Sequence, residues 1–133
     1  DGLDAVFKTG GASGPYPYAG GLRWKVDATQ AKGARASNVE VFDGATRTWG
    51  PLNLTKTYRL FVLSFNATGG DGYTTLANVP EARRSDVGVQ DADVLQSYID
   101  SLPRNGAGLP VMSRLDASLY STQSFIGPVA PPK

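Results

Sequence analysis

Apolar and polar residues alternate along two stretches of the chain, which is the pattern of a strand with one buried face. The first stretch is Leu22–Asp27, and the second is Asn38–Asp43, which ends in the pair Asp43-Gly44. Because Asp-Gly favours a tight hairpin turn, we expect Thr46–Trp49 to return antiparallel to the second stretch. The pattern therefore predicts one strand followed by a hairpin.

Two further segments have the composition of strands. Thr57–Ser64 is mostly apolar on both faces, which predicts a central strand covered on both sides. Leu109–Leu115 predicts a last edge strand, because Pro110 near its start cannot donate to a neighbouring strand.

Helical patterns occur in the middle and at the start of the chain. Ala92–Leu102 spaces its apolar residues as an amphipathic helix does, with Asp91 as the expected N-cap and Pro103 as the stop. Asp1–Lys8 is typical of the last turns of a helix that ends at Gly10-Gly11. A start inside a helix suggests a domain cut from a longer protein; a mature secreted chain after processing is the alternative.

The strands come mostly as hairpins and do not alternate regularly with helices. This order predicts an α+β fold with a largely antiparallel or mixed sheet and packed helices. The length of 133 residues is typical of a single domain. We assign residues 1–126 to that domain and residues 127–133 to a Pro-rich tail that we expect to be frayed.

Composition excludes several kinds of chemistry. The chain has no Cys and no His, which rules out disulfides, thiolate catalysis and a Ser-His-Asp triad. Its formal net charge is +1 with scattered Lys and Arg, so we expect no nucleic-acid polymer as partner. No run of about eighteen apolar residues is present, so no membrane span is predicted.

A glycine-rich stretch after Ser64 carries the most informative side chains. Phe65 precedes a short spacer and then Gly69–Gly72, a glycine turn that encloses Asp71. A carboxylate can accept hydrogen bonds from both hydroxyls of a ribose, and an aromatic face can stack on a base. The alternative is an ordinary tight turn, with Phe65 in the core and Asp71 bonded to its own backbone.

A second aromatic stretch, Gly14–Leu22, leads into the first predicted strand. Tyr16 and Tyr18 lie there among Pro and Gly residues, which make the loop stiff. One of the two rings could form the other half of an aromatic clamp. The alternative is that both rings only cap the core.

Together these stretches resemble the C-terminal domain of the 5'-nucleotidase family, which includes UDP-sugar hydrolases, NAD nucleotidases, 2',3'-cyclic-nucleotide phosphodiesterases and animal ecto-5'-nucleotidase. The resemblance rests on Phe65 through Tyr73, on Gly14 through Leu22 and on the helix at Asp91–Val94. It covers roughly residues 3–115.

The resemblance implies a nucleoside site. In the family a base lies between two aromatic rings, which fall here on Tyr16 and Phe65, and a ribose-binding carboxylate falls on Asp71. A tyrosine replaces the commoner phenylalanine at the first ring, so its hydroxyl needs a partner. Tyr18 is a rival for that ring or a contact to the base edge.

The resemblance also implies the setting of this domain. It would be the substrate-specificity domain of an exported, periplasmic or secreted phosphohydrolase of nucleotide catabolism. Two divalent metal ions and the bond cleavage belong to an N-terminal metallophosphoesterase domain, so we expect no cofactor in this chain and no activity from it alone. Alternatives are a self-contained binding or interaction module, or a domain of a cyclic phosphodiesterase or thiosulfohydrolase.

Overall fold

The computed structural model describes residues 1–8 and 14–127. The chain divides into two compact units, Asp1–Asn78 with Asp116–Lys133, and Val79–Leu115. The predicted helix stop at Gly10-Gly11 and all of the predicted tail after Gly127 lie outside the described residues.

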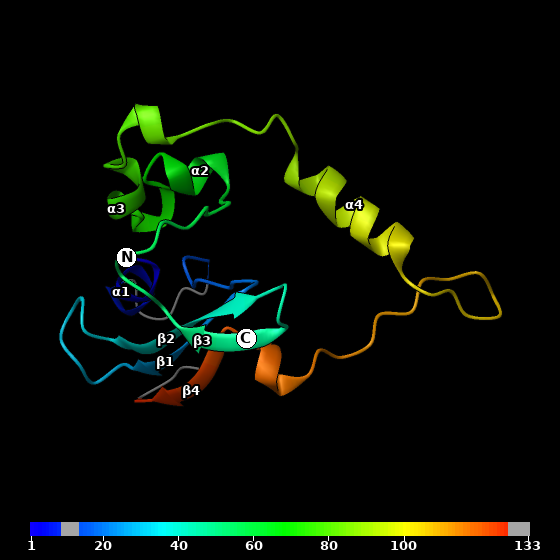
Figure 1. Cartoon of the computed structure of the whole chain (residues 1–133), viewed down its shortest axis with the longest axis horizontal. Coiled ribbons are helices and arrows are strands. Elements are labelled where there is room, and N and C mark those ends of the chain that lie inside the picture. Colours follow the sequence, from blue (N-terminus) through cyan, green and yellow to red (C-terminus); the bar gives the residue numbers. More distant parts are fainter. Residues whose placement is uncertain (9–13, 128–133) are drawn as a thin grey trace. The chain divides into compact units, whose positions relative to one another are not determined.

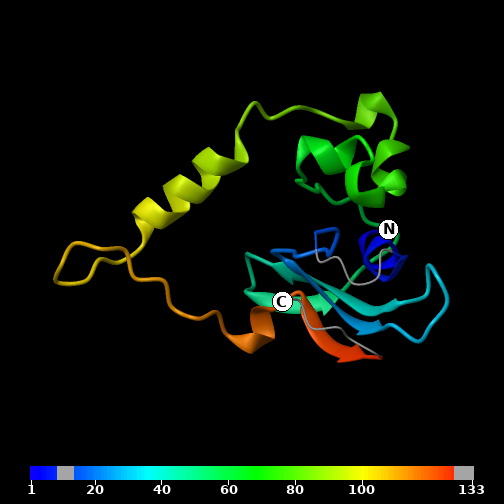
Figure 2. The same cartoon turned by 180° about the vertical axis from the view of Figure 1, so that it is seen from behind.

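The first unit is built on a four-stranded mixed sheet in the order β3-β2-β1-β4 (Figures 1 and 2). The strands are β1 (Leu22–Asp27), β2 (Ala36–Asp43), β3 (Thr48–Pro51) and β4 (Thr122–Ile126). β1 pairs antiparallel with β2 and parallel with β4, and β2 pairs antiparallel with β3. The expected α+β fold with a mixed sheet is confirmed, although β4 is absent from the sequence-based expectations.

The predicted hairpin forms between β2 and β3. Phe42 pairs with Trp49 and Asp43 with Thr48, so the return strand begins two residues later than expected. The Asp43 carboxylate accepts hydrogen bonds from the backbone N–H groups of Ala45 and Thr46, at 2.8 and 3.2 Å. This side chain closes the turn, as Asp does in many tight turns.

The core lies between β1 and the N-terminal helix α1 (Gly2–Lys8). Trp24 and Val26 point to the same face of β1 and are buried, with Leu3 of α1 against them. Partly buried side chains complete this cluster: Tyr16, Ala19, Leu22, Val39 and Phe125. In Figures 1 and 2, α1 lies between the sheet and the segment that carries α2 (Ser64–Ala67) and α3 (Thr74–Ala77).

The predicted central strand over Thr57–Ser64 is wrong. Residues 57–63 form no strand in the described structure, and Leu60, Phe61 and Leu63 are exposed. An apolar run indicates that a segment tends to be buried. A strand also needs a neighbouring strand for its backbone hydrogen bonds, and the apolar run does not provide one. Both sides of β1 are already occupied by β2 and β4, so this segment has no central place in the sheet.

The second unit contains the predicted amphipathic helix, α4 (Asp91–Ser101). Asp91 is not its N-cap: Gln90 holds that position, and the Asp91 carboxylate accepts from the N–H of Ala92 at 2.9 Å. The helix ends before Pro103, as expected.

The predicted edge strand over Leu109–Leu115 is also wrong. Arg104 and Pro110 make an isolated bridge, and the N–H of Val111 bonds to the carbonyl of Pro103 at 2.7 Å. These contacts close a local loop, which uses the backbone groups that a strand would offer to a sheet.

Candidate nucleoside site

The glycine stretch forms a compact turn that exposes Asp71. Short helix α2 leads into Gly69, which has a φ of 99°, and a 3₁₀ turn follows over Gly70–Gly72. Asp71 itself has a φ of 55°, in the left-handed region that Asp tolerates better than most residues. Asp71 therefore has an unusual backbone conformation and lies between two glycines, with its carboxylate exposed.

Phe65 lies against this turn. A Cβ atom on Gly70 would come within 2.5–2.6 Å of three ring atoms of Phe65, so the ring needs the glycine in order to rest there. The ring is 59% exposed, which excludes the alternative of Phe65 as a core residue. The second predicted ring and the predicted carboxylate thus belong to one small structure.

Tyr73 connects the turn to the aromatic loop. Its hydroxyl donates to the carbonyl oxygen of Pro15 at 3.0 Å, although the two residues are 58 positions apart. Burial raises the pKa of the Tyr73 phenol above its ordinary value, and the negative charge of Asp71 raises it further. The two segments predicted to form the site are therefore joined next to Tyr16 and Asp71.

Tyr16 and Tyr18 are ring neighbours with different surroundings. Their centroids lie 5.1 Å apart, with the planes tilted by 50°. The Tyr16 ring packs beside the core cluster, and its hydroxyl shares a 2.6 Å hydrogen bond with Oγ1 of Thr122. Tyr18 is 74% exposed. Tyr16 is the anchored ring of the pair and Tyr18 the accessible one.

Thr122 is the residue that sequence reasoning missed. It lies on the unexpected strand β4, opposite Trp24 of β1, and satisfies the hydroxyl of Tyr16. The tyrosine at the first ring position signalled that a partner was needed. Nothing in the spacing could identify a threonine 106 residues away.

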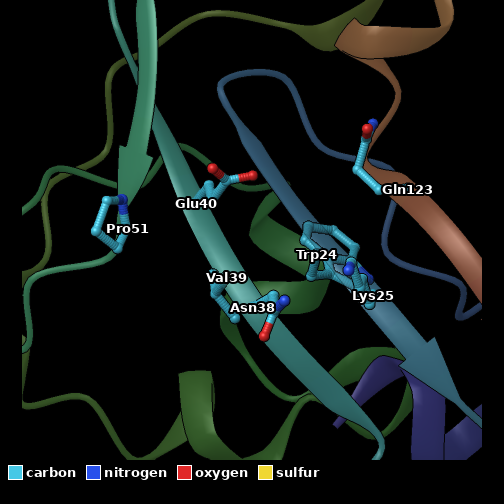
Figure 3. Close-up of a pocket in the computed structure, with 7 residues that line it drawn as sticks. All are labelled: Trp24, Lys25, Asn38, Val39, Glu40, Pro51 and Gln123. Carbon is cyan, nitrogen blue, oxygen red and sulfur yellow. The ribbon is translucent and has the colours of Figure 1, made fainter.

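A pocket of about 370 Å³ lies elsewhere, on the sheet (Figure 3). Seven residues line it: Trp24, Lys25, Asn38, Val39, Glu40, Pro51 and Gln123. Its one carboxylate, Glu40, is already paired with Arg23 at 2.7 Å. None of the predicted site residues lines it. We base the candidate site on the glycine turn, where the exposed Phe65 ring lies against Gly70 and the exposed Asp71 follows directly.

Within residues 1–8 and 14–127, no three Asp or Glu side chains gather closely enough to hold a metal ion. No helix in that same part of the chain has the length and apolar character to cross a membrane. The described residues therefore do not fit a metal centre.

The half-buried phenols of Tyr16 and Tyr73 predict how stability depends on alkaline pH. Burial raises the pKa of Tyr16, although its hydrogen bond to Thr122 opposes the shift, and burial likewise raises the pKa of Tyr73. The native state thus keeps protons that unfolded tyrosines release above about pH 10. The stabilisation is complete below that pH and is lost as the pH rises through the raised values.

We expect the free energy of unfolding, measured by urea titration, to fall as the pH is raised beyond about 10. The fall should be shallower in Tyr16→Phe and Tyr73→Phe variants and shallowest when both changes are combined. A double variant that keeps the full pH dependence would assign the effect to other groups.

Comparison with known proteins places these features in a family. Residues 2–78 match the family described as 5'-nucleotidase, C-terminal domain. The chain is 32% identical over 97 residues to NAD 5'-nucleotidase of Haemophilus influenzae, covering 70% of this chain and 16% of that protein. It is 40% identical over 76 residues to protein UshA of Escherichia coli, covering 57% of this chain and 12% of that protein.

A solved structure shows the same likeness. The crystal structure of a 5'-nucleotidase precursor from Thermus thermophilus superposes with a TM-score of 0.63 at 30% identity, covering 81% of this chain and 19% of that one. The chain thus spans less than a fifth of these relatives. It belongs to the 5'-nucleotidase C-terminal domain family.

Proposed function

We propose that this chain binds the nucleoside part of the substrate for a 5'-nucleotidase-type phosphohydrolase. In this proposal a base stacks between Phe65 and a ring of the aromatic loop, Tyr16 in the first instance with Tyr18 beside it. The carboxylate of Asp71 accepts hydrogen bonds from the two hydroxyls of the ribose. Bond cleavage takes place in another domain of the same protein.

The observation that carries this proposal is the turn in which Phe65 and Asp71 adjoin. The ring rests against Gly70 and remains 59% exposed, so it offers a flat apolar surface to a ligand. The exposed carboxylate of the next residue can accept from a diol. An aromatic face beside a carboxylate that can accept from two hydroxyls suits a nucleoside better than a phosphate.

The expected interaction energies are large enough only for weak binding by this chain alone. Stacking contributes about 1–3 kcal/mol per base face, and a charged hydrogen bond about 1.5–3 kcal/mol. Loss of rigid-body freedom opposes them by about 4–15 kcal/mol. We therefore expect this chain alone to bind nucleosides at about millimolar concentration or more weakly.

The remaining chemistry is proposed for a domain outside this chain. Two divalent metal ions in an N-terminal metallophosphoesterase domain would supply an activated water, with the nucleoside domain moving about a hinge to deliver the phosphate. Export to the periplasm or the cell exterior is part of the same proposal. The names of two relatives, the NAD 5'-nucleotidase of Haemophilus influenzae and the 5'-nucleotidase precursor of Thermus thermophilus, support this class of substrate.

Phe65→Ala and Gly70→Ala test the proposal in the full-length protein that carries this chain. Phe65→Ala removes the ring, and we expect the KM for a nucleoside monophosphate to rise by about 5- to 150-fold, the equivalent of one stacked face. Gly70→Ala keeps the ring but displaces it, because the new Cβ would lie 2.5 Å from the ring tip. We expect Gly70→Ala to raise the KM as well, by no more than Phe65→Ala does.

Gly44→Ala is the matched control, because a Cβ there meets nothing within 4 Å. It should leave KM and melting temperature unchanged. Since the exposed Phe65 ring can swing outward, Gly70→Ala should also leave the melting temperature nearly unchanged. An unaltered KM in Phe65→Ala would remove the stacking surface from the proposal.

A further inference from the structure

Gly2 makes room for the contact between Tyr73 and Pro15. A Cβ atom on Gly2 would collide with the Tyr73 hydroxyl and lie 2.5 Å from the Pro15 oxygen. Gly2 is buried at the start of α1. The donor, the acceptor and this helix start therefore meet at one point, where only a hydrogen atom fits.

The start of the chain contacts both the turn and helix α3, which follows it, near this junction. The carboxylate of Asp1 accepts from the N–H of Thr75 at 2.7 Å. A Cβ on Gly72 would lie 3.3 Å from the Cβ of Ala5. The turn that carries Asp71 is thus seated on α1, and the Tyr73 hydroxyl reaches from this seat to the aromatic loop.

We propose that Tyr73 is a positioning residue that sets the separation between the two nucleoside-contacting loops, through its hydrogen bond to Pro15 over Gly2. The inference rests on the proposed function. Pro15 immediately precedes Tyr16, and Tyr73 follows Asp71 by two residues, so this bond fixes both sides of the site. A slot for a flat base requires its walls to be held to about 0.5 Å, which a loop alone does not ensure.

The position of Tyr73 predicts which kinetic constant it controls. Its hydroxyl is bonded to protein, so the residue contributes to binding of the nucleoside and not to the bond being broken. Interactions that are equal in the ground and transition states change KM and leave kcat unaltered. The KM of a substrate that has neither base nor ribose should not depend on the separation of the two loops.

The test is steady-state kinetics of the full-length protein with Tyr73→Phe. We expect KM for a nucleoside monophosphate to rise by about 2- to 10-fold, the effect of one neutral hydrogen bond, with kcat unchanged. The KM for p-nitrophenyl phosphate should stay the same. Equal changes in both substrates, or a fall in kcat alone, would overturn the positioning role.

Gly2→Ala provides a second route to the same junction. It should raise the nucleotide KM in the same way, and the double variant with Tyr73→Phe should show less than the product of the two single effects, because both break one bond. Multiplying effects would overturn the shared junction. Tyr98→Phe, an exposed hydroxyl removed on α4, is the control and should change nothing.

Phe65→Ala in the same experiment separates the two proposals. A raised nucleotide KM in Phe65→Ala with wild-type KM in Tyr73→Phe would reject the positioning role and leave the nucleoside site standing. Wild-type KM in Phe65→Ala would remove the stacking surface from the proposed nucleoside site, whatever the result for Tyr73→Phe.

Discussion

Trp24→Ala is expected to lower the free energy of unfolding by about 3–5 kcal/mol, the usual cost of deleting a buried aromatic ring. Trp24 is 8% exposed and lies in the core cluster with Leu3 and Val26. Small domains have only about 5–15 kcal/mol in total, so this loss is a large fraction of the stability. Urea unfolding followed by circular dichroism measures the change.

The effect should also reach the candidate site. Trp24 pairs with Thr122 across β1 and β4, and Thr122 holds the hydroxyl of Tyr16. A cavity at Trp24 would therefore loosen the anchored ring of the aromatic loop. We expect the Trp24→Ala protein that remains folded to bind nucleosides more weakly than the wild-type protein.

Two variants show that the burial of the ring is responsible. Trp24→Phe keeps most of the ring and removes an indole N–H that is buried without a hydrogen-bond partner among the described residues, so it should cost much less than alanine. Trp49→Ala removes a half-buried ring on the other face of the sheet, where Arg23 lies 4.4 Å from its centroid. That loss should be about 1–2 kcal/mol, because the ring is only partly removed from water and its contacts are with Phe42 and Arg23. Equal losses at Trp24 and Trp49 would contradict this account.

The elements that were predictable are those specified by local pattern. Alternation identified β1 and β2, and Asp43-Gly44 identified the hairpin because the Asp43 carboxylate bonds within its own turn. Helical spacing identified α4 to within one residue at each end. In each case the interactions that decide the structure lie within a few residues of one another.

The features that were not predictable depend on distant partners. Thr57–Ser64 has the composition of a buried strand, yet the places beside β1 are taken by β2 and by β4, and β4 comes from the end of the chain. β4 has a weak pattern of its own. β4 pairs parallel with β1, and no local signal in the sequence reveals this pairing.

The candidate site divides in the same way. The glycine turn, with Phe65 beside Asp71, follows from residues within one stretch and from the family resemblance. The hydrogen bonds of Tyr73 to Pro15 and of Tyr16 to Thr122 span 58 and 106 residues, so only the folded chain identifies those pairs. The roles of Tyr16, Tyr18, Phe65 and Asp71 toward a ligand stay predictions.

Asp71→Gly is expected to raise the KM for a ribonucleotide by about 10- to 150-fold in the full-length protein, because a charged hydrogen bond contributes about 1.5–3 kcal/mol. Glycine is the informative replacement. Asp71 has a φ of 55°, which glycine adopts without strain, whereas alanine would disturb the turn as well as remove the carboxylate. Asp71→Asn, which tolerates the same backbone, should give an intermediate loss.

The ribose provides the control that isolates this contact. With a 2',3'-dideoxynucleotide, which lacks both hydroxyls, wild type and Asp71→Gly should have similar KM values, because the carboxylate has nothing to accept from. Asp43→Asn, at another Asp-Gly pair in the β2–β3 turn, should leave both substrates unaffected. If Asp71→Gly weakens the dideoxynucleotide as much as the ribonucleotide, the carboxylate shapes the turn and does not bind the sugar, because only a direct contact distinguishes the two ligands.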